Sequence, residues 1–108
     1  MKSIQAIVAD IRAIYRETFG GKEKGRYKIS RANFRLICGR KKLESVFLEK
    51  VVSAALEDGF VVVELGDYFC VIAEGTMLSY RPVPKLVAEK YAEPDFTFFA
   101  PVDGEDED

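Results

Sequence analysis

The chain has 108 residues, of which 48% are hydrophobic and 31% are charged, and its formal net charge at pH 7 is −2. This length and balance are typical of one soluble globular domain. Its apolar runs are too short to span a membrane, and its N-terminus lacks the long apolar segment of a secretory signal. We therefore expect a cytoplasmic protein without a membrane segment.

The residues that most enzymes and metal sites need are scarce. The chain has no His, the commonest general base and metal ligand, and only two cysteines, Cys38 and Cys70. Each cysteine falls on a predicted apolar face and is interpreted as a small buried hydrophobe. Two distant cysteines exclude a structural zinc site. No Gly-rich phosphate loop is present. We predict no enzyme, no metal and no cofactor.

The first predicted helix covers residues 3 to 19. Ser3 is a suitable N-cap, and Gly20 and Gly21 favour a helix end. One apolar stripe at three- and four-residue spacing contains Ile4, Ile7, Val8, Ile11, Tyr15 and Phe19.

A loop over residues 20 to 25 leads to a short strand over residues 26 to 29. Ser30 is a suitable N-cap for a two-turn helix over residues 31 to 38, which Gly39 ends. A basic turn, Arg40 to Lys42, then precedes a longer amphipathic helix over residues 43 to 58.

Two β-rich runs, residues 60 to 65 and 68 to 73, flank Gly66-Asp67. Two such runs separated by two residues with Gly first predict a type II′ hairpin. Residues 81 to 84 are expected to be extended, because each proline restricts the residue before it. A short terminal helix is predicted over residues 85 to 92, so the predicted fold class is α+β.

One domain is expected over residues 1 to 100, followed by an acidic tail over residues 101 to 108. The tail is expected to be disordered, because five of its last six residues are acidic. A second hypothesis is that the tail folds back and competes with nucleic acid for the basic residues. Phe96, Phe98 and Phe99 precede the tail, and as an exposed apolar patch they would mark a contact site for a protein partner.

Positive charge is concentrated in one window of the chain. From residue 22 to residue 42 the net charge is +8, with Glu23 as the single acid. Such asymmetry favours a nucleic-acid or acidic partner. The alternative is a solvated surface with no partner. The basic residues are Lys22, Lys24, Arg26, Lys28, Arg31, Arg35, Arg40, Lys41 and Lys42.

The element order helix, strand, helix, turn, helix, hairpin resembles the winged helix-turn-helix superfamily over roughly residues 3 to 73. The resemblance implies a three-helix core, with the short strand joined to the hairpin in a small antiparallel sheet. It also implies that the helix over residues 43 to 58 enters the DNA major groove, while the hairpin contacts the flanking backbone.

The chain departs from this pattern in its charges. The outward face of the implied recognition helix balances Glu49 and Glu57 against Lys42 and Lys50. The implied wing carries Glu64 and Asp67 and has no basic residue. DNA readers usually present cationic or amide side chains at these places.

We therefore expect a small DNA-binding protein, a transcriptional regulator or accessory factor, that holds double-stranded DNA mainly through phosphate contacts. A homodimer is expected. The alternative is a protein-interaction module, an adaptor or inhibitor, that uses the late aromatics or the acidic tail. The expected nucleic-acid-binding residues are Lys22, Lys24, Lys28, Arg31, Arg35, Arg40, Lys41, Lys42, Ser45 and Lys50.

Overall fold

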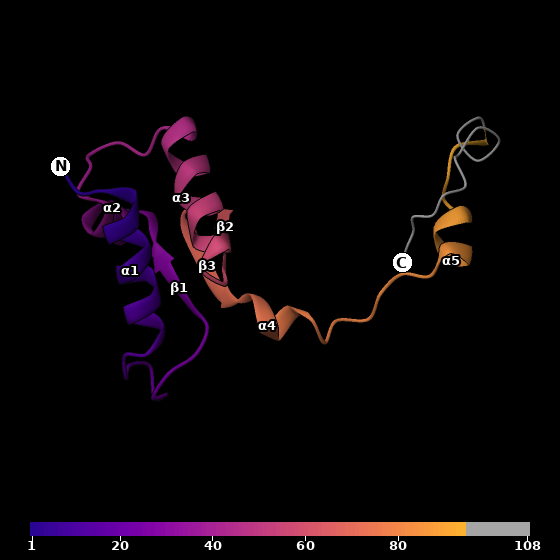
Figure 1. Cartoon of the computed structure of the whole chain (residues 1–108), viewed down its shortest axis with the longest axis horizontal. Helices are drawn as coiled ribbons and strands as arrows, with labels where there is room; N and C mark the ends of the chain where they lie inside the picture. Colours follow the sequence, from indigo (N-terminus) through magenta and orange to yellow (C-terminus); the bar gives the residue numbers. More distant parts are fainter. Residues whose placement is uncertain (95–108) are drawn as a thin grey trace. The chain divides into compact units, whose positions relative to one another are not determined.

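The computed structural model describes residues 1–94, which form two compact units (Figure 1). The first unit is Met1–Leu78 and the second begins at Ser79. The expected domain boundary after residue 100 lies outside the described residues. The elements are α1 (Ile4–Tyr15), β1 (Tyr27–Ser30), α2 (Arg31–Cys38), α3 (Ser45–Glu57), β2 (Phe60–Leu65), β3 (Tyr68–Ala73), α4 (Glu74–Met77) and α5 (Lys85–Glu89).

The three strands form one antiparallel sheet in the order β1-β3-β2, so β3 lies in the middle. Val71 on β3 is paired with Tyr27 on one side and Val62 on the other. At the β2–β3 turn Gly66 has φ of +74°, while Asp67 does not have a positive φ. This is the backbone pattern of the predicted type II′ hairpin. The α+β class is confirmed.

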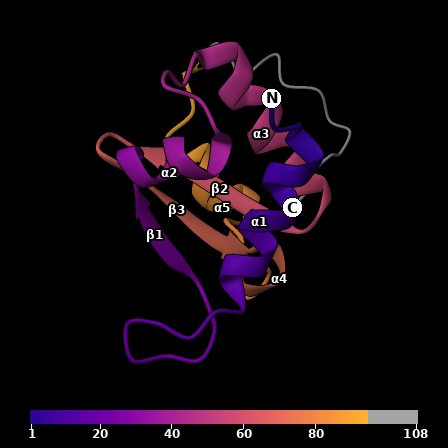
Figure 2. The same cartoon turned by 90° about the vertical axis from the view of Figure 1, so that its left-hand side faces the viewer.

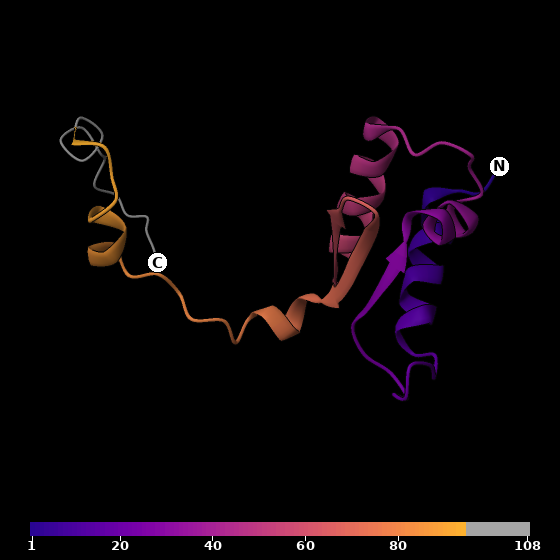
Figure 3. The same cartoon turned by 180° about the vertical axis from the view of Figure 1, so that it is seen from behind.

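Helices α1, α2 and α3 pack against one face of this sheet (Figures 2 and 3). Their apolar stripes meet the inward side chains of the strands in one core. The buried core residues are Ile7, Val8, Ile11, Tyr27, Phe34, Cys38, Leu48, Val51, Ala55, Phe60, Val62, Phe69 and Val71.

At the centre of the core, Phe34 on α2 stacks on Phe69 on β3. Their ring centroids lie 4.3 Å apart with an interplanar angle of 24°, and neither side chain is exposed. Such aromatic pairs add stabilisation beyond the area that they bury. The stack joins the first half of the unit to the hairpin.

The first helix ends earlier than predicted. It stops at Tyr15, and Phe19 lies in the following loop with 47% of its surface exposed. Phe19 and Lys22 instead exchange backbone hydrogen bonds of 2.9 and 3.0 Å across Gly20-Gly21, whose φ values are +59° and +80°. Positive φ at both central residues is typical of a type I′ turn. The glycines therefore form a turn of their own, and the spacing of Phe19 was coincidental.

Other boundaries also shift. Helix α3 begins at Ser45, because residues 40 to 44 are taken up by the connection from α2. Helix α5 ends at Glu89, earlier than the predicted residue 92. The chain after the hairpin forms one helical turn, α4. No helix in residues 1–94 is long and apolar enough to cross a membrane.

The hairpin strands β2 and β3 carry apolar residues on the other face of the sheet as well. Val63, Leu65 and Tyr68 on this face are 37–47% exposed. The register places Val61 opposite Ile72, Val63 opposite Cys70 and Leu65 opposite Tyr68, so every outward position of the hairpin strands is apolar. We define these six residues as the outer sheet face. Apolar residues on both faces indicate a sheet that is suited to being covered on both sides.

Removing the aromatic stack should destabilise the first unit. Phe34→Ala leaves a cavity against Phe69 and should lower the free energy of unfolding by about 3–5 kcal/mol, measured by urea denaturation. Leu36→Ala is the matched control on the same helix, because Leu36 is 75% exposed. The control should change stability by less than about 0.5 kcal/mol. Equal losses in the two variants would contradict the assignment of Phe34 to the core.

Candidate nucleic-acid interface

One group of cationic side chains surrounds the connection between α2 and α3. Helix α2 ends at Gly39, whose φ of +68° reverses the chain so that the Arg40 amide donates to Arg35 O at 3.2 Å. Glycine is favoured here because the left-handed conformation costs it little. We define the turn cluster as Arg35, Arg40, Lys41 and Lys42.

Arg40 is held against the protein. Its guanidinium carbon lies 3.8 Å from the centroid of the Phe47 ring, and Nη1 donates to Cys38 O at 3.3 Å. This stacking fixes the turn on the first part of α3 and covers one face of Phe47. Arg40 therefore contributes its charge from a fixed position.

Arg35, Lys41 and Lys42 make no ion pair with any described residue. Two shallow hollows of about 350 and 340 Å³ adjoin them and share Gly39, Arg40 and Lys41 in their lining. An unpaired cation beside a hollow can neutralise a phosphate without first breaking an internal contact. The turn cluster is thus a surface suited to polyanions.

Helix α3 places Ser45 and Lys50 on its exposed surface, as expected. The same helix exposes Glu49, so the face remains close to neutral. Ser45 and Glu49 line a groove shared with Glu64 on β2. This flank of α3 is therefore unfavourable for phosphate.

Two predicted residues are engaged elsewhere. Arg31 pairs with Glu64, donates to Gly66 O at 3.1 Å and lies 5.0 Å from the centroid of Phe69. It fastens α2 to the hairpin and is not available without loss of those contacts. The Lys28 ammonium lies 5.1 Å from the ring centroid of Tyr68 on the outer sheet face.

Lys22 and Lys24 lie on the loop between α1 and β1, which is distant from the turn cluster. The loop is fastened to the end of α1 by a hydrogen bond from Gly25 N to Tyr15 O at 2.9 Å. The turn cluster instead lies at the beginning of α1, where Arg40 reaches Met1 Sδ at 3.1 Å. Twelve helical residues correspond to about 18 Å of helix. Lys22 and Lys24 therefore lie at one end of α1 and the turn cluster at the other (Figure 1).

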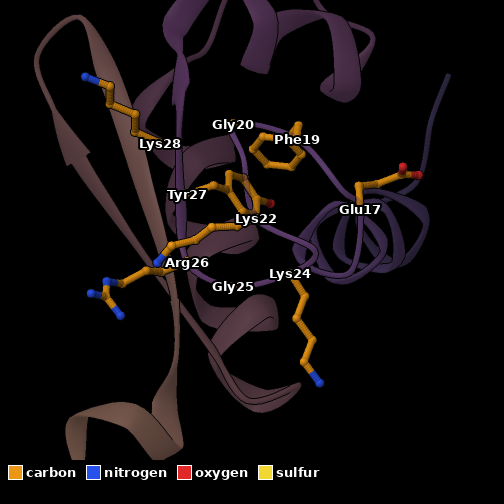
Figure 4. Close-up of a pocket in the computed structure, with 9 residues that line it drawn as sticks. All are labelled: Glu17, Phe19, Gly20, Lys22, Lys24, Gly25, Arg26, Tyr27 and Lys28. Atoms are coloured by element: carbon orange, nitrogen blue, oxygen red, sulfur yellow. The ribbon is translucent and has the colours of Figure 1, made fainter.

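The loop encloses a small pocket of about 190 Å³. The rings of Phe19 and Tyr27 meet edge to face with centroids 6.1 Å apart. Figure 4 shows these rings in the middle of the pocket, with Lys22 and Arg26 extending to one side and Lys24 and Glu17 pointing away. We define the loop pocket by its lining residues, Glu17, Phe19, Gly20, Lys22, Lys24, Gly25, Arg26, Tyr27 and Lys28.

Phe19 and Arg26 are pocket residues that the sequence prediction did not include among the site residues. Phe19 was assigned to the helix, although the Gly-Gly pair after it was a signal for a tight turn. Phe96, Phe98, Phe99 and the acidic tail lie outside the described residues. Within residues 1–94 no cluster of metal-ligating side chains occurs.

Burial raises the pKa of two side chains near these surfaces, Cys38 and Tyr27. It raises the pKa of the Cys38 thiol to about 11, so this thiol stays protonated at neutral pH. Arg40 and Lys2 act in the opposite direction on the pKa of Cys38 and only partly offset the burial. Burial also raises the pKa of Tyr27, whose hydroxyl donates to Ile11 O at 3.0 Å.

Replacing Tyr27 with Phe should reveal this shift. At pH 7 the lost hydrogen bond should cost about 0.5–1.5 kcal/mol of unfolding free energy. The pKa of Tyr27 is higher in the folded state than in the unfolded state, where it is near 10. The hydroxyl therefore stabilises the fold fully below about pH 10, and this stabilisation is lost as the pH rises above that value. Urea denaturation between about pH 8 and 11 should therefore show a steeper loss for the parent chain than for Tyr27→Phe. Identical pH dependence would refute the shift.

Comparisons with known proteins do not assign this chain to a family. No family model matches it, and neither the curated proteins nor the solved structures include a significant match. A function for the chain therefore rests on the residues and charges of its surface.

Proposed function

We propose that the chain is a small DNA-binding protein of winged helix-turn-helix type, a transcriptional regulator or accessory factor that holds double-stranded DNA mainly by its phosphates. Three features support the proposal. The element order is that of the superfamily, the β1-β3-β2 sheet joins the short strand to the hairpin, and α3 has an exposed face.

The observation that carries the proposal is the turn cluster. Arg35, Lys41 and Lys42 present three charges without ion-pair partners among the described residues, on the last turn of α2 and the connection that leads to α3. Phosphate contacts around the start of a recognition helix orient a protein on duplex DNA. The near-neutral surface of α3 supports little base reading, so we propose binding of low sequence specificity.

A second candidate function, a protein-interaction module, is favoured by the outer sheet face. Here we propose that a second copy of the chain pairs with the edge strand β2, so that the apolar face continues from one copy to the other. β2 is an edge strand without Pro, Lys or bulge, which usually protect an edge from pairing, and its one charged residue, Glu64, is paired with Arg31. Antiparallel pairing of two β2 strands about Val63 sets Val63 against its counterpart and Val61 against Leu65, which keeps apolar residues together on one face.

The double change Lys41→Ala and Lys42→Ala should weaken binding to a random-sequence duplex. Two lost phosphate contacts should reduce the slope of log K against log salt concentration by about 2. Fluorescence anisotropy across a salt series of about 50–200 mM measures both quantities. The matched control, Lys85→Ala with Lys90→Ala, removes the same charge from the second unit and should leave the slope nearly unchanged. No duplex binding by the parent chain at low salt would contradict the proposed function.

Placing a charge on the edge strand should abolish self-association. Val63→Lys introduces two facing ammonium groups at the centre of the proposed strand pair and should convert a dimer into a monomer in sedimentation velocity. Lys50→Ala, on the exposed surface of α3, serves as a control that keeps the edge intact. A parent chain that stays monomeric at high concentration would contradict this pairing.

A further inference from the structure

The loop pocket is not used by the proposed duplex contacts. It lies at the end of α1 near Tyr15, whereas the turn cluster lies at the beginning of that helix. The pocket combines an exposed aromatic ring with cations that have no ion-pair partner among the described residues. Together these two features suit the pocket to a ligand that has an apolar part and a negative charge.

The loop holds this arrangement by its backbone. Phe19 and Lys22 are joined by two reciprocal hydrogen bonds, and Gly25 N donates to Tyr15 O. The Thr18 hydroxyl also contacts Glu23 O at 3.4 Å. Compact loops whose ends are fastened in this way are frequently functional. Phe19 is therefore presented on a supported turn, with Tyr27 anchored beneath it by its hydrogen bond to Ile11 O.

The aromatic surface in this pocket is open. Phe19 is 47% exposed, whereas the Phe47 ring beside the turn cluster is covered by the Arg40 guanidinium. Covering the exposed part of the Phe19 ring with an apolar group is favourable in proportion to the area covered. The ring of Phe19 thus offers a free surface for a flat, apolar group.

The charges beside the ring determine what else the ligand must carry. Four cationic residues line the pocket against the single carboxylate of Glu17. Lys22 and Arg26 extend to the same side of the rings, while Glu17 points away from them (Figure 4). A ligand that satisfies both features has a planar aromatic part and an adjacent negative charge, which is the chemistry of a nucleotide.

The size of the pocket restricts the form of that nucleotide. At about 190 Å³ it is smaller than the usual range for a drug-sized ligand and has no room for a base pair. We propose that the loop pocket binds one unpaired nucleotide of single-stranded DNA, with its base against Phe19 and its phosphates at Lys22 and Arg26. Stacking on an aromatic side chain tolerates any base, so this site selects for an unpaired strand rather than for sequence.

Phe19 substitutions test the stacking. With a labelled thymidine oligonucleotide in fluorescence anisotropy, Phe19→Ala should weaken binding by roughly tenfold, within the range measured for base–aromatic stacking. Phe19→Leu keeps an apolar side chain but removes the ring, and it should also weaken binding. Phe19→Tyr keeps the ring and should bind like the parent chain. Equal affinity of the parent, Phe19→Ala and Phe19→Leu would overturn the proposal.

The cations are tested separately from the ring. Lys22→Ala with Arg26→Ala should reduce the salt slope for single-stranded DNA by about 1.4, since each contact contributes about 0.7. In the Lys41→Ala, Lys42→Ala variant, the effect of Phe19→Ala on oligonucleotide binding should be unchanged. Duplex binding therefore tests the turn cluster, and the effect of Phe19→Ala on oligonucleotide binding tests the loop pocket. An unchanged salt slope in the Lys22 and Arg26 variant would overturn the assignment of the phosphates.

Competition identifies which part of the nucleotide is recognised. Thymidine monophosphate should displace the oligonucleotide from the parent chain more effectively than inorganic phosphate at the same concentration and ionic strength. The advantage should disappear in Phe19→Ala. Equal displacement by the two competitors would show an anion site without base recognition, and would overturn the proposal.

Discussion

The rest of the first unit depends on the contact between Phe34 and Phe69. Phe69 lies on the central strand β3, to which both β1 and β2 are paired, so its position determines that of the whole sheet. Phe34 attaches α2 to that strand, and Arg31 adds a cation–π contact to Phe69 and an ion pair to Glu64. Close packing makes such a centre sensitive to small changes in volume.

This centre also determines where the charged side chains lie. With α2 held on β3, its C-terminus and the turn cluster are located beside Met1 at the start of α1. The glycine turn at residues 20 and 21 begins instead at the far end of α1 and carries Lys22 and Lys24. Two separate basic surfaces are therefore available. The turn cluster is the proposed site for duplex phosphates and the loop pocket the proposed site for an unpaired nucleotide. The two surfaces share no residue.

The neutral flank of α3 and the apolar outer sheet face distinguish this chain from the usual pattern of DNA readers. Glu64 lies near α3 and neutralises Arg31 on α2, and the hairpin strands themselves contain no Lys or Arg. The outer sheet face leaves Val63, Leu65 and Tyr68 partly in water. The proposed strand pairing would satisfy the free backbone groups of the β2 edge and place apolar side chains of the two copies next to one another on this face.

The sequence by itself determined the elements that depend on local chemistry. Ser3 and Ser30 accept hydrogen bonds as predicted N-caps, Gly39 ends α2, and Gly66-Asp67 forms the hairpin turn. These features follow from residues a few positions apart. Phe19 leaves the helix because of the local turn at Gly20-Gly21. Only the tertiary structure decided that Arg31 pairs with Glu64 and that the basic residues separate into two groups. Those outcomes depend on contacts between residues distant in the chain, and side-chain charge alone does not reveal which partner lies within reach.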